Sequence, residues 1–239
     1  MKDFSLSRNV ILTPYSAAVL KDIKTGVIAD LHIGMEETSM ISTRLQTVEM
    51  TRKTRELILK HKLERIVLNG DMKYSFGKRT RQEWDELANY VENIQKLAEV
   101  VAIKGNHDFY LQNMLKGAEV KGIFEMKNYR ITHGNLDLKP EKNIMTIIGN
   151  EHPMIKMRDE VGAKFETPAF VLCKKENVLV IPAFNPLTRG RNIINSDDWL
   201  SPILKRCDVE SSEVYAIAED EVVALGKLKN LGKYAGQPI

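Results

Sequence analysis

Five short clusters in this sequence combine the side chains that bind divalent metal ions and transfer protons. The clusters are Asp30-Leu31-His32, Asn69-Gly70-Asp71, Gly105-Asn106-His107-Asp108, His133-Gly134 and Gly149-Asn150-Glu151-His152. Imidazole nitrogens combined with carboxylate and carboxamide oxygens favour borderline ions such as Mn, Fe, Zn or Ni over Ca or Mg. An aspartate can bridge two such ions, and a pair of cations stabilises both oxygens of a phosphate displacement. The residue types therefore indicate metal-assisted hydrolysis.

The histidines are concentrated in these clusters. Four of the five histidines belong to them, namely His32, His107, His133 and His152. A single histidine is more often a hydrogen-bonded structural residue than a ligand. Four histidines that each stand near Asp or Asn instead favour a shared site. His61 is the exception, and its charged surroundings predict a solvent-exposed position.

Each cluster follows a short run of apolar and β-branched residues that predicts a strand. These runs are Val27–Ala29, Arg65–Leu68, Val100–Ile103, Tyr129–Thr132 and Ile144–Ile148. In an open α/β sheet, ligands bind beyond the carboxyl ends of the strands. We therefore expect the five clusters to meet at one edge of the sheet structure.

Two amphipathic segments separate the first three predicted strands. Apolar residues at spacings of three and four predict one helix, and they are Trp84, Leu87, Val91, Ile94 and Ala98. A second helix is expected from about Ser42 to Lys60, with Leu45 and Val48 facing the core. Strands that alternate with helices predict a parallel or mixed sheet with right-handed crossovers.

The second half of the sequence predicts short strands in hairpins. The candidate strands are Ala169–Cys173, Val178–Ile181, Val214–Ile217 and Val222–Leu225. Such hairpins would form a second sheet packed on the first. The fold class is therefore predicted as α/β, with two packed mixed β-sheets flanked by helices. No repeat, low-complexity tract or linker interrupts the sequence, which favours a single domain over residues 1–239.

Composition excludes several classes of protein. Hydrophobic residues make up 43% of the 239 residues and charged residues 28%, as in soluble globular proteins. No apolar run is long enough to span a membrane, and the start of the sequence lacks the features of a secretion signal. The two cysteines, Cys173 and Cys207, are expected to be reduced, so a cytoplasmic location is predicted. A net charge of +3 suits an anionic substrate but provides no strongly basic nucleic-acid-binding arm.

The order of the clusters resembles the motif series of the calcineurin-like metallophosphoesterases over about Val27 to Pro153. The sequence Gly105-Asn106-His107-Asp108 is the specific part of the match, since Asp-x-His or Gly-Asp alone is common. Three further stretches are similar to the ICC-like branch of that family, which includes DNA-ligase-associated members. They are Gly70-Asp71-Met72-Lys73, Glu151-His152-Pro153 and Pro182-Ala183-Phe184-Asn185-Pro186. The resemblance implies a four-layer αββα sandwich and hydrolysis of a phosphate ester by water activated at a dinuclear metal centre.

The resemblance also implies a role for each cluster residue. One metal would be held by Asp30, His32, Asp71 and His152, and Asp71 would bridge to a second metal. The second metal would also be bound by Asn106 and His133, with Asn150 at the remaining position. His107 would be the acid that protonates the leaving oxygen or stabilises the phosphoryl charge, and Asp108 would support the site from behind. Manganese is the favoured metal, with Fe, Zn and Ni as alternatives.

Asn150 departs from the family pattern, which usually has histidine at this position. A carboxamide oxygen is a poorer donor than imidazole for these ions. The substitution therefore predicts that the second metal binds more weakly than the first. Alternatively, Asn150 reflects drift in a protein that no longer catalyses, although the other ligand residues are all retained.

Basic and aromatic residues near the clusters bear on the substrate. Lys73, Arg189 and Arg191 are candidates for contacts with a phosphate group, and the run Lys78, Arg79 and Arg81 could do the same or form a solvated surface. Four aromatic residues could stack on a base or pack in the core, namely Tyr74, Phe76, Phe109 and Tyr110.

These features favour a phosphodiester substrate, either a nucleotide or nucleic acid, over a phosphomonoester. The rival hypothesis is a catalytically weak or inactive metal-binding module in a nucleic-acid-processing assembly. A plain nucleotide-binding protein is disfavoured, because the sequence has no glycine-rich phosphate loop. The sequence identifies no protein partner.

Overall fold

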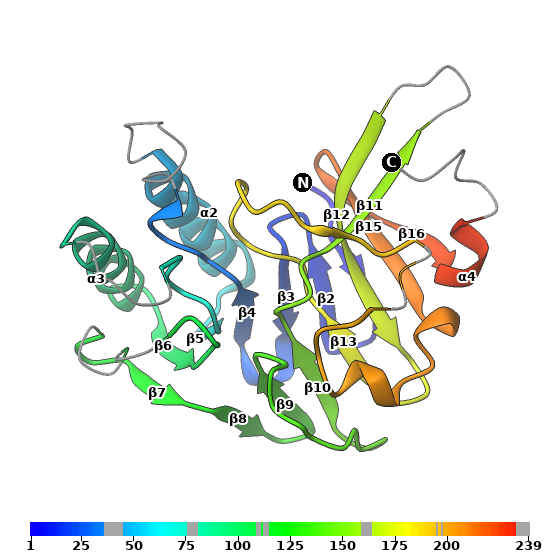
Figure 1. The fold of residues 1–239 in the computed structure, drawn as a ribbon. Helices are drawn as coiled ribbons and strands as arrows, with labels where there is room; N and C mark the ends of the chain where they lie inside the picture. The colour runs from blue at the N-terminus through cyan, green and yellow to red at the C-terminus, as the bar shows by residue number, and fades with distance from the viewer. Residues whose placement is uncertain are drawn as a thin grey trace.

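Two β-sheets packed face to face form the centre of the computed structural model (Figure 1). The structure describes residues 1–35, 45–75, 81–108, 111, 115–158, 164–194, 196 and 198–232. Long helices lie beside one sheet, and short helical turns lie beside the other (Figure 1). This arrangement confirms the predicted fold class.

The first sheet has the strand order β1-β2-β3-β4-β5-β6-β7. Its strands are β1 (Phe4–Ser5), β2 (Val10–Thr13), β3 (Ala17–Leu20), β4 (Thr25–Ala29), β5 (Arg65–Asn69), β6 (Glu99–Ile103) and β7 (Glu119–Lys121). The strands from β1 to β4 are antiparallel to their neighbours, whereas those from β4 to β7 run parallel. The parallel crossovers contain helices α2 (Leu45–His61) and α3 (Arg81–Gln95).

The second sheet has the order β14-β11-β12-β13-β10-β9-β8, and a hairpin of β15 and β16 pairs with β12. Its strands are β8 (Ile123–Met126), β9 (Tyr129–Thr132), β10 (Met145–Ile148), β11 (Pro153–Arg158), β12 (Lys164–Cys173), β13 (Val178–Val180), β14 (Arg191–Asn192), β15 (Glu213–Ala218) and β16 (Glu221–Lys227). Strand β10 is parallel to both β9 and β13, so this sheet is also mixed.

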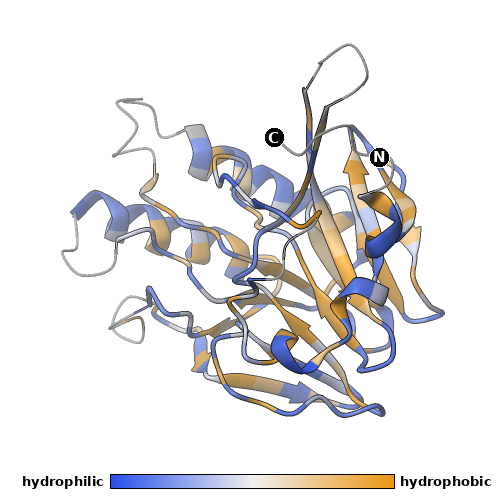
Figure 2. Cartoon of the chain, turned by 45° about the vertical axis from the view of Figure 1, so that its right-hand side comes forward, coloured by the Kyte–Doolittle hydropathy of each residue, from blue (hydrophilic) through white to orange (hydrophobic). Residues whose placement is uncertain are grey.

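Three apolar layers hold the sandwich together. The layer between the sheets includes Val27 and Val67 from the first sheet and Ile147 and Phe170 from the second. A second layer joins the outer face of the first sheet to α2 and α3. The third layer covers the outer face of the second sheet with three short elements, η3 (Leu204–Arg206), η4 (Val209–Ser211) and α4 (Leu228–Leu231). Hydrophobic residues accordingly line the strands in the interior (Figure 2).

Every predicted strand that precedes a polar cluster is present, within two residues at each end. The β4, β5 and β6 register pairs Ala29 with Asn69 and Asn69 with Ile103, so these three strands end at the same level of the sheet. Strands β9 and β10 also run parallel to each other. Parallel strands that end together present the residues that follow them at one edge.

The prediction for α2 was wrong in one respect. Val48 is 64% exposed, and the buried face of the helix instead includes Met50, Leu57 and Ile58. Thr47 and Thr54 are also buried, where their hydroxyl groups bond Glu86 and Tyr90 of α3 respectively. These polar residues on the buried face obscured the helix register in the sequence.

Several other features were not predicted from the sequence. The N-terminal strands β1 to β3 and the strands β7, β8, β11 and β14 were all missed. Residues 42–44 of the predicted first helix lie outside the described residues. Within the described ranges, no helix is both long and apolar enough to cross a membrane.

Two leucines of α2 test the packing of the layer between this helix and the sheet. Leu57 is fully buried, whereas Leu59 is 65% exposed. We expect Leu57→Ala to lower the free energy of unfolding by about 2–5 kcal/mol, because it leaves a cavity. Leu59→Ala, which makes the same change in helix propensity, should alter it by less than about 0.5 kcal/mol. Chemical denaturation measures both values, and equal losses would contradict this account of the layer.

Candidate metal centre

The side chains of five predicted ligands converge at the carboxyl ends of the strands. His152 Nε2 lies 3.3 Å from Asp30 Oδ1 and 3.3 Å from His32 Nε2. His133 lies between the two aspartates, with Nδ1 3.6 Å from Asp30 Oδ1 and Nε2 3.4 Å from Asp71 Oδ1. Residues separated by more than a hundred positions therefore form one continuous cluster.

Three overlapping groups within this cluster have their donor atoms close enough to share a metal ion. The groups are Asp30 with His32 and His152, His32 with Asp71 and His107, and Asp30 with Asp71 and His133. In each group the donor atoms all lie within 4.8 Å of one another. Asp71 belongs to two of the groups, and so does Asp30. Each of these carboxylates is therefore close enough to contribute to two neighbouring metal positions.

The chemistry of the cluster fits a divalent cation. Asp30 Oδ1 and His32 Nδ1 are enclosed and have no hydrogen-bond partner among the described residues. Asp30 is fully buried and Asp71 is 2% exposed. Buried carboxylates and facing imidazole nitrogens are stabilised when a cation lies between them.

The two asparagines contribute differently to the cluster. Asn106 is exposed, and its Oδ1 lies 3.0 Å from His133 Nε2, so its carboxamide oxygen points towards the cluster. Asn150 is positioned by its backbone, whose N–H donates to Asp30 Oδ2 at 3.0 Å. Metal ligation by either side chain stays a prediction.

His107 lies at the margin of the cluster with its ring orientation fixed. Its Nδ1 is 2.9 Å from the carbonyl oxygen of Tyr74, so Nδ1 carries the proton and donates it. Its Nε2 then faces Asp71, 3.6 Å from Oδ2. The backbone N–H of His107 also donates to Asp71 Oδ1 at 3.0 Å. This geometry suits a group that exchanges a proton beside the predicted ligands.

Asp108 ties together the loops that follow β5 and β6. Its carboxylate accepts hydrogen bonds from the backbone N–H groups of Met72, at 3.0 Å, and Gly105, at 2.9 Å. Burial raises the pKa of Asp108 to about 6, against the effect of these hydrogen bonds. The side chain thus holds these two loops together, and its supporting role in the site stays a prediction.

Opposing charges shift the pKa values inside the cluster. Burial alone would raise the pKa of Asp71, but the hydrogen bond and charge of His133 outweigh it and lower this pKa to about 2. Burial alone would lower the pKa of His133, but Asp71 and Asp30 raise it to about 9. Burial also lowers the pKa of His32, to about 4. A metal ion must therefore displace a proton from His133 but finds His32 already neutral at pH 7.

The backbone of the ligands is unusual. The φ angle is positive at Asp30 (58°), His32 (42°), Asp71 (44°), Asn150 (66°) and His152 (44°). Side chains other than glycine rarely adopt this left-handed conformation, which costs free energy and is found at functional sites. The backbone thus turns sharply at these predicted ligands.

Gly70 and Gly105 allow the loops to approach the ligands closely. A Cβ atom at Gly70 would overlap the ring of His133, and one at Gly105 would overlap the carboxylate of Asp71. The glycines beside the motifs are therefore required by the packing of the site.

Sequence reasoning missed two residues that hold the site in position. Asn185 is buried, and its Nδ2 donates to the carbonyl oxygens of Leu31 at 2.9 Å and His32 at 3.3 Å. Glu83 of α3 accepts a 2.9 Å hydrogen bond from the backbone N–H of Ser75, next to Tyr74. Asn185 stands in the proline-containing stretch Pro182-Ala183-Phe184-Asn185-Pro186, which could have drawn attention to it. Nothing in the sequence distinguished Glu83 from a surface carboxylate.

The predicted basic contacts have different surroundings. Lys73 is 1% exposed, and its ammonium donates to the carbonyl oxygen of Ser75. Arg191 lies 3.6 Å from the buried carboxylate of Glu151 and over the ring of Trp199. Arg189 is exposed. A substrate contact by Lys73 or Arg191 would thus require the side chain to leave a partner, whereas Arg189 faces solvent.

Other candidates in the sequence are placed as follows. Arg81 is exposed at the start of α3. Tyr74 lies beside the cluster, with its ring centroid 6.2 Å from that of His32. His61 is only 9% exposed at its side chain and lies 3.6 Å from Asp3, so the expected solvent-exposed position was wrong. It nevertheless lies outside the metal cluster. Five predicted contact residues lie outside the described residues, namely Phe76, Lys78, Arg79, Phe109 and Tyr110.

Comparison with known proteins identifies the family of this architecture. A family model described as calcineurin-like phosphoesterase matches residues 23–212. The crystal structure of nuclease MPE from Pseudomonas putida superposes with a TM-score of 0.66 at 19% sequence identity, covering 94% of this chain and 99% of that one. YfcE, a phosphoesterase from E. coli, gives a TM-score of 0.41 at 13% identity, covering 84% and 96% of the two chains. A comparison with curated proteins found no match.

Two glycines test whether the metal centre depends on the close approach of the loops. We expect Gly105→Ala to weaken Mn²⁺ binding at least about tenfold, because the new methyl group displaces the carboxylate of Asp71. Gly122→Ala is the control, since a Cβ atom there meets no atom within 4 Å. Isothermal titration of both metal-free variants gives the affinities. Unchanged binding in Gly105→Ala would show that Asp71 is not held by this contact.

Proposed function

The chain belongs to the calcineurin-like phosphoesterase family, hydrolases that act on phosphoester bonds, and from this premise we propose that it hydrolyses a phosphodiester at a centre of two divalent cations. A nucleotide or nucleic acid is the favoured substrate. One observation carries the proposal: Asp71 shares one donor group with His32 and another with His133, the residues assigned to the first and the second cation. A single carboxylate shared between neighbouring donor groups is what a pair of bridged cations requires.

The first cation would be held by Asp30, His32, His152 and Asp71. The second would be held by Asp71, His133 and Asn106, with Asn150 at the position that usually carries histidine. When bound, such cations polarise the phosphate and increase the acidity of water. Manganese suits this mixture of imidazole and oxygen donors, and Fe, Zn and Ni remain alternatives.

The residues of the chain complete the chemistry. His133 Nδ1 donates to the carbonyl oxygen of Asn69 at 3.2 Å, which leaves Nε2 directed at Asp71 and Asn106. Tyr74 fixes the ring of His107 in the same manner, so that Nε2 of His107 faces the site. His107 is proposed to protonate the leaving oxygen or to stabilise charge on the phosphoryl group. Asp108 would hold the loops during this step.

The phosphodiester assignment has two sources of support. The nuclease from Pseudomonas putida shares this fold over nearly its whole length. Arg189 is exposed on the segment that follows Asn185, where it could contact a phosphate group. We further propose that residues 1–239 act as one domain in the cytoplasm. The rival is a metal-binding module with little or no turnover.

Activity assays on three variants test the proposal. With Mn²⁺ and bis(p-nitrophenyl) phosphate, we expect Asp71→Asn to lower kcat by about a thousandfold or more. His107→Ala should lower kcat by about 10²–10⁴-fold, since it removes a proton donor. His61→Ala is the control and should retain activity, because His61 lies outside the metal cluster.

The monoester p-nitrophenyl phosphate separates the two ester classes in the same assay. A higher kcat/KM for the monoester would contradict the phosphodiester assignment. Tight Mn²⁺ binding without turnover of either ester, combined with retention of DNA or RNA, would favour the metal-binding module.

Asn150 provides a separate test of the second cation. We expect titration of the wild-type protein to give one tight and one weaker Mn²⁺ site, because carboxamide is a poorer donor than imidazole. Asn150→His should tighten the weaker site by about tenfold and leave the other unchanged. Two equally tight sites in the wild type, unaffected by the substitution, would contradict the assignment of Asn150.

A further inference from the structure

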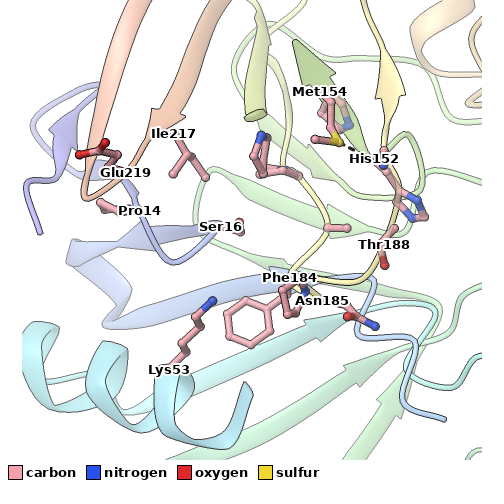
Figure 3. A pocket seen from close by; sticks show the side chains of 16 residues that line it. Pro14, Ser16, Lys53, His152, Met154, Phe184, Asn185, Thr188, Ile217 and Glu219 are labelled. Carbon is pink, nitrogen blue, oxygen red and sulfur yellow. Dashed lines mark hydrogen bonds between the residues drawn. The ribbon is translucent and has the colours of Figure 1, made fainter. Parts of the chain in front are cut away.

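A cavity of about 350 Å³ adjoins the metal cluster at His152. Figure 3 shows His152 on one side of this cavity and Lys53 and Glu219 on the far side. The cavity lies where α2, the turns after β2 and β15 and the segment 182–190 meet. Its volume is in the lower part of the range of about 300–1,000 Å³ that is typical of small-ligand pockets.

The walls of the cavity are mainly apolar and rigid. Five prolines line it, namely Pro14, Pro153, Pro168, Pro182 and Pro186. Ile217, Phe184 and Met154 add further apolar surface. Proline has no backbone N–H and a fixed φ angle, so these walls offer flat surfaces and few hydrogen-bond donors. Thioether and ring contacts of this kind favour an aromatic ligand.

The cavity is tied directly to the strand that carries the first metal ligand. The backbone N–H of Phe184 donates to the carbonyl oxygen of Ala29 at 2.8 Å, and Ala183 forms a bridge with Ala29. Ala29 immediately precedes Asp30. The backbone N–H of Arg191 also donates to the carbonyl oxygen of His152 at 2.9 Å. The cavity wall and the ligands are therefore fixed relative to each other.

The far side of the cavity has one cation and one anion. Lys53 Nζ forms an ion pair with Glu49 Oε1 at 3.8 Å, a distance that leaves its N–H groups able to donate hydrogen bonds to a ligand. Glu219, in the turn between β15 and β16, provides carboxylate oxygens. An ammonium donor and a carboxylate acceptor suit the mixed edge of a nucleobase, whereas a hydrocarbon chain would form a hydrogen bond with neither.

We propose that this cavity binds the nucleoside of a phosphodiester whose phosphate group lies at the metal cluster. The base packs against the prolines, Phe184 and Ile217, and its polar edge faces Lys53 and Glu219. This inference rests on the proposed function and specifies its substrate class. It explains why an apolar, proline-lined space adjoins a centre that acts on a charged group.

Two substrates with the same leaving group test the proposal. They are the p-nitrophenyl ester of thymidine 5′-monophosphate and methyl p-nitrophenyl phosphate, so only the retained group differs. We expect the wild type with Mn²⁺ to show a kcat/KM at least about fivefold higher for the nucleoside ester, as stacking of one base would provide. Ile217→Trp, which fills the cavity, should remove this preference and leave the methyl ester within about twofold.

Lys53→Met provides a second variant that leaves the core intact, and it should lower the preference by about threefold or more. Two controls introduce the same new residues on α2 away from the cavity. Leu59→Trp and Arg55→Met replace exposed residues and should keep the wild-type preference. Retention of the nucleoside preference in both cavity variants would overturn the proposal, as would equal turnover of the two esters by the wild type.

Binding without metal separates this proposal from the proposed function. If neither ester is hydrolysed, the proposed function fails, and the cavity is tested with thymidine 5′-monophosphate and inorganic phosphate in EDTA. Tighter binding of the nucleotide, lost in Ile217→Trp and Lys53→Met, would support the cavity assignment. Equal affinity for nucleotide and phosphate in the wild type would overturn it.

Discussion

The structure depends on the balance of charge among Asp30, Asp71 and His133. Two buried carboxylates lie within 3.6 Å of one imidazole. Unpaired carboxylates in this environment would be costly. Without a metal, the imidazole balances them by holding a proton, which is the cause of its raised pKa. A cation that takes up the same position must displace that proton, so metal affinity rises with pH while His133 is protonated.

The sheets supply the rigidity that this balance requires. Strands β4, β5 and β6 end in register, and each then turns through a left-handed or glycine-containing loop. Asp108, Asn185 and the backbone N–H of His107 hydrogen-bond these loops to one another. The strain of the loops is thus offset by contacts that are buried and mutually supporting. Stability and ligand geometry come from the same hydrogen bonds.

The part of the site that the sequence predicted has a simple physical origin. A buried strand such as Ile66–Leu68 must be apolar, so a sudden Asn69-Gly70-Asp71 shows where the strand leaves the core. The missed features lack this contrast. Thr54 is polar but buried because its hydroxyl bonds Tyr90 and a backbone carbonyl group, and so it concealed the register of α2. Glu83 resembles a surface charge because its partner, Ser75, belongs to a different element.

Asn150 illustrates how backbone and ligand requirements compete at one position. Its φ of 66° is one that asparagine adopts more readily than most residues. Its backbone N–H, not its side chain, makes the hydrogen bond that holds Asp30. A histidine there would donate the same backbone hydrogen bond and be a stronger metal ligand. His152 also has a positive φ, of 44°, and its imidazole contacts Asp30 directly. In the proposed centre, imidazole would serve the first metal and carboxamide the second, and this difference in donor is why the two positions are expected to differ in affinity.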